Sequence, residues 1–198
     1  MELQNLVVKL PVAPPADSTL AALIPVLHGW IQKRARPELL IDLADYRHVP
    51  AGPGLVLIGL EADYSLDHSG GRWGVRYSRK APVTGSPQER LSQALTAALE
   101  AGQALAADPA LAGGIRYSGQ ELEIYLNDRA LAVNDAAGIT ALRGVIEPFL
   151  QARLDGVGYQ LAPAESDPRA LPGLHIRFAR AFTLAELLSR FSLQPVLA

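Results

Sequence analysis

Residues 39–80, LLIDLADYRHVPAGPGLVLIGLEADYSLDHSGGRWGVRYSRK, decide the fold that this sequence predicts. Apolar and polar residues alternate over Leu39–Tyr46 and again over Arg72–Lys80, which is typical of strands with one covered face. Leu55–Leu60 is a continuous apolar run of strand length, and we expect it to form a central strand covered on both faces. Pro50–Gly54 contains two prolines and two glycines, and it predicts a bend between the first two strands. The stretch therefore favours a mainly antiparallel sheet.

The alternation also predicts which side chains share a face of each strand. In the first strand, one face should carry Leu39, Ile41 and Leu43. In the last strand of the stretch, one face should carry Trp73, Val75 and Tyr77. A hairpin loop is expected at Asp67–Gly71, directly before that last strand.

The remaining elements follow from helix caps and short apolar runs. Ser86–Glu89 is a capping box with proline at the first helical position, and its helix should continue to about Ala107. A third helix should begin after Asn134 or Asp135, and a short fourth helix after Thr183. Further strands are predicted at residues 6–12, 115–117, 122–126, 157–161 and 174–178, the second and third forming a hairpin, with an edge strand at 193–197.

The first helix, which should begin at Asp17 or Ser18, contains His28-Gly29-Trp30. A glycine inside a helix costs about 1 kcal/mol relative to alanine, so we expect a strand or a ligand to approach closely at Gly29. His28 and Trp30 are accordingly candidates for contact with a ligand or partner. The alternative is that both simply pack at the border of the core, because aromatic residues at helical spacing usually do so.

Taken together, the elements predict an α+β fold of mainly antiparallel sheets with helices on one face. They divide into two tandem halves, residues 1–113 and 114–198, each close to the ferredoxin-like βαββαβ pattern, the first with an added hairpin. The leading helices of the halves align without a gap and share Gln32 with Gln151 and Arg34 with Arg153. The alignment is compatible with an internal duplication, but any two amphipathic helices align in this way and only these two pairs are identical.

Composition excludes several classes of protein. The chain has 198 residues, no cysteine and a formal net charge of −2, which excludes disulfides and thiolate chemistry and gives no general attraction to nucleic acid or membrane. No signal peptide, transit peptide or transmembrane segment is visible, so a cytoplasmic location is expected. The frequent alanine, leucine, arginine and proline suggest a bacterial genome rich in G and C.

The first candidate site is a cluster of carboxylates and a histidine around the 39–61 hairpin: Asp42, Asp45, His48 and Glu61. Across an antiparallel hairpin, Glu61 should lie near Leu39 or Asp42, and two paired carboxylates can perform acid–base chemistry. Asp45 could orient His48 as a general base. The alternative is that these residues cap turns or lie in solvent.

A second candidate is the cationic face of the strand over residues 72–80, formed by Arg72, Arg76 and Lys80. Ferredoxin-like sheets can bind RNA on strand aromatics, but the RNP pattern is missing and the net charge is negative. Cations on a sheet face also protect an edge from pairing. These three residues are candidates for contact with a ligand or partner, with nucleic acid a poor candidate, and the favoured alternative is that they simply face solvent.

Motifs for metals and cofactors are missing. The four histidines do not have the short spacing of metal ligands. Neither of the two glycine-rich turns within residues 39–80 runs from a strand into a helix, as a phosphate loop must. We therefore expect neither metal nor cofactor.

The leading functional hypothesis is a cytoplasmic interaction or assembly subunit without catalytic chemistry of its own, with a protein partner or self-association. The alternative is a small-molecule-binding protein or enzyme that uses the Asp/His/Glu cluster. Weak RNA binding by residues 72–80 is the third hypothesis.

Overall fold

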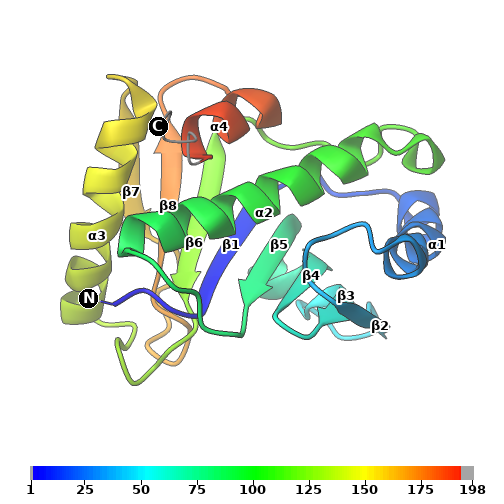
Figure 1. Cartoon of the computed structure of the whole chain (residues 1–198), viewed down its shortest axis with the longest axis horizontal. Coiled ribbons are helices and arrows are strands. Elements are labelled where there is room, and N and C mark those ends of the chain that lie inside the picture. The colour runs from blue at the N-terminus through cyan, green and yellow to red at the C-terminus, as the bar shows by residue number, and fades with distance from the viewer. Residues whose placement is uncertain (1, 193–198) are drawn as a thin grey trace.

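The protein is described by a computed structural model that covers residues 2–192. Its strands form one sheet of eight in the order β2-β3-β4-β5-β1-β6-β8-β7, and every neighbouring pair is antiparallel (Figure 1). The strands are β1 Leu6–Pro11, β2 Leu40–Tyr46, β3 Gly54–Gly59, β4 Ala62–Asp67, β5 Gly74–Arg79, β6 Glu121–Leu126, β7 Tyr159–Pro163 and β8 Gly173–Phe178. The helices are α1 Asp17–Lys33, α2 Pro87–Ala107, α3 Ala136–Leu154 and α4 Leu184–Phe191, with 3-10 turns at Ser69–Gly71 and Pro109–Leu111.

Within the described residues, the four α-helices pack on one face of the sheet and none covers the other face. In Figure 1, α2 crosses the middle of the sheet over β1, with α3 at the β7 end and α1 at the β2 end. Alternate side chains of β1 follow this division: Leu10 contacts α2, where a Cβ on Gly102 would lie 2.9 Å from its Cδ1. Lys9 points to the opposite, helix-free face.

The predicted α+β class with an antiparallel sheet is confirmed. The predicted caps of three helices are also present: the Ser86–Glu89 capping box, Asp135 before α3 and Thr183 before α4. The strands of both halves lie in one continuous sheet, and in each half the last strand lies beside the first, as β5 beside β1 and β8 beside β6. The ferredoxin-like duplication and the boundary at residue 113 stay predictions.

Several predicted elements are wrong. β4 was not predicted: the chain turns at Leu60-Glu61 and continues with alternating residues through Asp67. Tyr117 does not form a hairpin with the strand after it, but makes an isolated bridge to Val12. β3 is partly exposed and lies one strand from the edge, so it is not a fully covered central strand. The predicted strand at 193–197 lies outside the described residues.

The predicted facing of β2 is also wrong, and a β-bulge is the physical reason. The pairing of β2 with β3 shifts register between Leu40 and Asp42, which inserts one residue and exchanges the faces. Leu40 is therefore buried and Leu43 packs against the core, whereas Leu39 and Ile41 are exposed.

The expected close approach at Gly29 is wrong, because a Cβ at this position would meet no atom within 4 Å. Replacing Gly29 with alanine is therefore expected to raise the free energy of unfolding by about 0.5–1 kcal/mol, since alanine is the better helix former. Chemical denaturation of the two proteins measures the difference. A destabilised variant would mean that something occupies this position after all.

Candidate functional site

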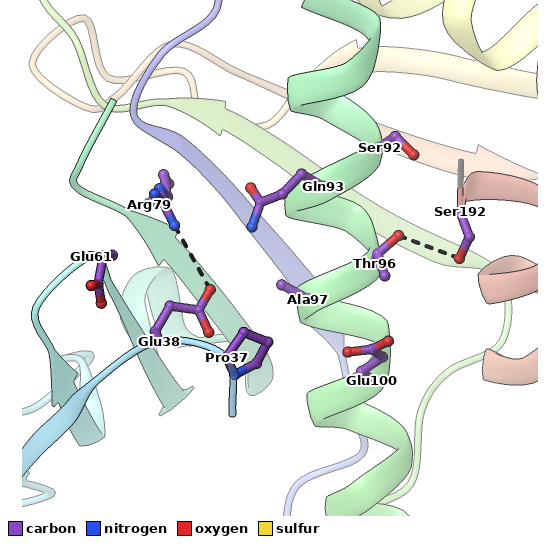
Figure 2. A pocket seen from close by; sticks show the side chains of 10 residues that line it. All are labelled: Pro37, Glu38, Glu61, Arg79, Ser92, Gln93, Thr96, Ala97, Glu100 and Ser192. Atoms are coloured by element: carbon purple, nitrogen blue, oxygen red, sulfur yellow. Dashed lines mark hydrogen bonds and ion pairs between the residues drawn. The ribbon is translucent and has the colours of Figure 1, made fainter. Parts of the chain in front are cut away.

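A cavity of about 680 Å³ lies on the helical face between α2 and the segment that leads into β2 (Figure 2). One wall is the polar side of α2, with Gln93, Thr96 and Glu100. The opposite wall contains Glu38 before β2 and Arg79 at the end of β5. The remaining lining residues are Pro37, Glu61, Ser92, Ala97 and Ser192, the last described residue.

Glu38 is a buried carboxylate at the floor of this cavity. It accepts hydrogen bonds from the hydroxyls of Tyr64, at 2.6 Å, and Tyr77, at 3.1 Å, and Arg79 lies 3.9 Å away. Gln93 in turn donates to the Tyr77 hydroxyl at 2.9 Å. Burial is the main cause that raises the pKa of both tyrosines, so both phenols stay protonated and donate to the carboxylate.

The lining charges of this cavity are mainly negative. Glu61 accepts a hydrogen bond from the Leu39 amide at 3.0 Å, and Glu100 lies on the facing helix. Together with Glu38 there are three carboxylates and one cation, Arg79. The cavity therefore favours a cationic molecule or one rich in hydrogen-bond donors.

A second polar site lies at the centre of the helix-free face. We call Lys9, Asp67, Arg72, Arg76, Glu123 and Tyr125 the ionic cluster. Lys9 and Asp67 are buried and form an ion pair with Nζ and Oδ2 2.6 Å apart. Asp67 also accepts from Ser69 Oγ at 2.7 Å and lies 3.4 Å from Arg76. Burial is the main cause that lowers the pKa of Lys9, and the negative charge of Asp67 opposes this shift.

The other side of the ionic cluster is built on β6. Glu123 is buried, pairs with the Arg72 guanidinium and accepts from the Tyr125 hydroxyl at 2.7 Å. The strand register places Glu123 directly opposite Lys9 on β1 and His175 on β8. Charged and polar residues thus form a row across the middle of the sheet.

Two strand glycines leave room for this cluster. A Cβ on Gly74 would lie 2.6 Å from the Lys9 Cγ, so the lysine side chain crosses directly over Gly74 toward Asp67. A Cβ on Gly173 would lie 2.3 Å from the Tyr125 ring. At each of these two positions a long side chain of the ionic cluster passes so close on the helix-free face that a residue larger than glycine would not fit.

In the structure, Asp42, Asp45 and Glu61 of the predicted Asp/His/Glu cluster each bind a group outside the cluster. Asp42 accepts from the Leu43 amide at 2.8 Å, and Asp45 binds the Arg47 guanidinium, with 2.6 Å between Oδ2 and Nη2. The hydrogen bonds from Arg47 lower the pKa of Asp45 to about 2, so this carboxyl is ionised at neutral pH. His48 is exposed in the turn, and Glu61 lines the large cavity beside Leu39. Within residues 2–192, no hydrogen bond joins any two of the four.

The other predicted contact residues differ in their exposure and in their charge partners. His28 is exposed on α1, whereas Trp30 is buried, packs edge-on against Tyr64 at 6.3 Å and lies 4.2 Å below the Arg36 guanidinium. Each cation of the predicted basic face has a carboxylate partner: Arg72 has Glu123, Arg76 has Asp67 and Lys80 has Asp63. Arg76 shares Asp67 with Lys9, so its charge is only partly compensated.

Sequence reasoning missed Lys9, Glu38, Asp67, Glu123 and Tyr125 as site residues. A signal was available for two of them, because Lys9 interrupts the apolar run LVVKLP and Glu123 interrupts ELEIYL. A charged residue inside a short apolar strand is an unfavourable choice for stability alone.

No family model, no curated protein and no solved structure matches this chain. In the described part of the chain, no group of three or more His, Asp or Glu is placed to hold a metal ion. None of the described helices is long and apolar enough to cross a membrane.

Proposed function

We propose that this protein is an interaction subunit without catalytic chemistry of its own, which self-associates through the margin of the sheet at β2. The supporting observation is that most of the exposed large apolar side chains gather at β2 and the turns beside it. Among residues 2–192 there are seven such side chains, and five of them lie on β2 or on the turns beside it: Leu39, Ile41, Tyr46, Val49 and Leu60. We call these five the apolar margin. Exposed apolar residues gathered at one place are typical of a protein–protein contact.

The edge of β2 indicates how such a contact would form. Asp42 accepts from the Leu43 amide and Asp45 from the Arg47 amide at 3.0 Å, so one main-chain donor of this edge strand and one directly after it are already occupied. Charged side chains and a β-bulge are common protections against strand addition. The contact is therefore made by side chains of the apolar margin rather than by extending the sheet.

A second copy of the chain is the occupant that we propose. Most soluble oligomers are symmetric dimers in which the same patch meets itself. The apolar margin suits this arrangement, because Leu39 and Leu60 lie together at one end of β2, joined by the Leu60 amide to the Leu39 carbonyl at 2.8 Å. Val49 lies at the other end, so a two-fold axis near the middle of β2 brings apolar groups together at both ends.

Native mass spectrometry of the wild type and of three single-substitution variants tests this proposal. Ile41→Ser and Leu60→Ser, at side chains that are 55% and 60% exposed, should each weaken the dimer by about tenfold or more in Kd. Val133→Ser is the matched control, because Val133 is 50% exposed but lies far from β2 in the chain, and it should leave the dimer unchanged. A wild-type protein that is monomeric at about 100 µM, or equal weakening by all three variants, would contradict the proposal.

The large cavity of Figure 2 supports a second candidate function, the binding of a small molecule. Its volume is in the range of ligand sites, and Glu61, a predicted site residue, lines it. The same mass spectrum of protein isolated gently from its host distinguishes the two, because a bound ligand appears as a small added mass on the monomer. RNA binding is supported least, since Arg72, Arg76 and Lys80 are each paired with a carboxylate.

A further inference from the structure

A second cavity, of about 320 Å³, opens on the helix-free face beside the ionic cluster. Its floor contains Lys9, Asp67, Arg76 and Tyr125, which come from four neighbouring strands of the sheet. Its wall comes from the connection between β7 and β8 and includes Glu165 and Leu171; Ser69, Gly70, Asp167 and Ala170 complete the lining. The volume suits a small metabolite.

The wall of this cavity is held in place by a buried side chain. Asn134 donates from Nδ2 to the Glu165 carbonyl at 3.2 Å and to the Asp167 carbonyl at 2.7 Å. Arg129 also donates to the Arg169 carbonyl. The loop therefore carries Glu165 at a fixed position over the strands, as a preformed site requires.

Unused hydrogen-bonding capacity lines this cavity on both its floor and its wall. The Arg76 guanidinium has five N–H groups, but its contacts in the described chain are only Ser78 Oγ at 3.2 Å and Asp67 Oδ1 at 3.4 Å. The Glu165 carboxylate receives no hydrogen bond from the residues that the structure describes, and its Oε1 lies over Gly70, 3.0 Å from where a Cβ would be. Among the described residues, the floor thus offers guanidinium N–H groups of Arg76 that have no protein acceptor, and the wall offers a carboxylate, Glu165, that has no protein donor.

The charges around this cavity balance. Lys9 and Arg76 contribute two positive charges and Asp67 and Glu165 two negative ones, while Asp167 pairs with Arg169 at 2.9 Å. A simple anion would meet the repulsion of Glu165, and a simple cation that of Arg76. A molecule that carries both charges satisfies both Arg76 and Glu165. Such a ligand also gives a reason for the buried ion pair at the centre of the sheet, where apolar residues would stabilise the fold at least as well.

We propose that this cavity binds a small zwitterion of the α-amino acid class. The ligand carboxylate pairs with the Arg76 guanidinium, with Lys9 behind it, and the ligand ammonium pairs with Glu165. Leu171 and Ala170 lie beside the ligand side chain. The site is separate from the apolar margin and from the cavity of Figure 2, so its occupancy does not depend on the proposed self-association.

Isothermal titration calorimetry of the full chain with each standard amino acid, up to about 10 mM, tests the proposal. At least one should bind with a Kd below about 1 mM. Arg76→Gln and Glu165→Gln should each weaken binding by about tenfold or more, because each removes one charged hydrogen bond. Arg177→Gln, an exposed arginine on the same face, is the control and should bind as the wild type does.

Analogues with a single charge give the second comparison. Propionate and propylamine, which each keep one of the two charges, should bind at least about tenfold more weakly than the best amino acid. Equal binding of propionate, failure of every amino acid to bind, or unchanged binding by Arg76→Gln and Glu165→Gln would each overturn the proposal. Thermal unfolding of both variants, with Tm close to the wild type, shows that lost binding is not lost folding.

Discussion

Replacing Lys9 with methionine is expected to lower the free energy of unfolding by about 3–5 kcal/mol, the cost of leaving one partner of a buried ion pair uncompensated. Methionine keeps most of the volume of the lysine stem, so packing over Gly74 changes little. The Asp67 carboxylate remains fully buried and keeps its bonds to Ser69, but loses the Nζ contact at 2.6 Å. Arg76, at 3.4 Å, replaces that contact only in part.

Urea denaturation of the wild type, the Lys9→Met variant and the Lys9→Met/Asp67→Asn double variant measures this cost. If the uncompensated charge is the cause, adding Asp67→Asn should recover part of the loss, because the amide has no charge to bury and still binds Ser69. A Lys9→Met variant within about 1 kcal/mol of the wild type would show that Arg76 alone balances Asp67.

For Lys9→Met we also expect the loss of stability to depend on pH, with a sign that follows from the pKa of Lys9. Because burial lowers the pKa of Lys9 in the folded protein below 10.5, the unfolded chain binds more protons between that lowered pKa and 10.5. Stability contributed by this group therefore rises with pH across that interval. The difference in stability between wild type and Lys9→Met, measured from neutral to alkaline pH, should increase with pH, and the comparison cancels the tyrosines that both proteins share.

Local signals in the sequence predicted most of the elements correctly. The capping box at Ser86–Glu89 and the apolar spacing of α2 depend on residues within one or two turns of each other. β4 was missed although Ala62, Tyr64 and Leu66 alternate with polar residues, because the turn at Leu60-Glu61 contains neither proline nor an Asn-Gly pair. The bulge after Leu40 could not be predicted, since a bulge depends on the partner strand.

The sites were much harder to predict than the elements. Lys9 and Glu123 lie opposite each other only because β1 pairs with β6, and Asp67 reaches Lys9 only because Gly74 leaves room. Such contacts depend on strand order and register, which a single sequence does not contain. The predicted cluster of Asp42, Asp45 and His48 rests on their closeness in sequence. In the structure, each of the two aspartates accepts a hydrogen bond from a main-chain amide one or two residues further along the chain.

Gly54→Ala is expected to lower the free energy of unfolding by about 3 kcal/mol, through two separate costs. Gly54 has φ +68°, a left-handed conformation that costs an L-residue about 1–2 kcal/mol. A Cβ there would also lie 2.1 Å from the Leu66 carbonyl oxygen, so the β3–β4 backbone must shift, and forced overpacking costs about 1–3 kcal/mol. This glycine ends the bend that orients the hairpin carrying the apolar margin.

Gly71→Ala separates the two costs. Gly71 has φ +75°, but a Cβ there would meet no atom within 4 Å, so only the conformational cost of about 1–2 kcal/mol applies. Urea denaturation should therefore place Gly71→Ala between the wild type and Gly54→Ala. Equal losses in both variants would mean that the carbonyl of Leu66 moves without cost. Since Gly54 pairs with Tyr46 at the end of β2, the larger loss should be accompanied by weaker self-association, which Gly71→Ala should leave intact.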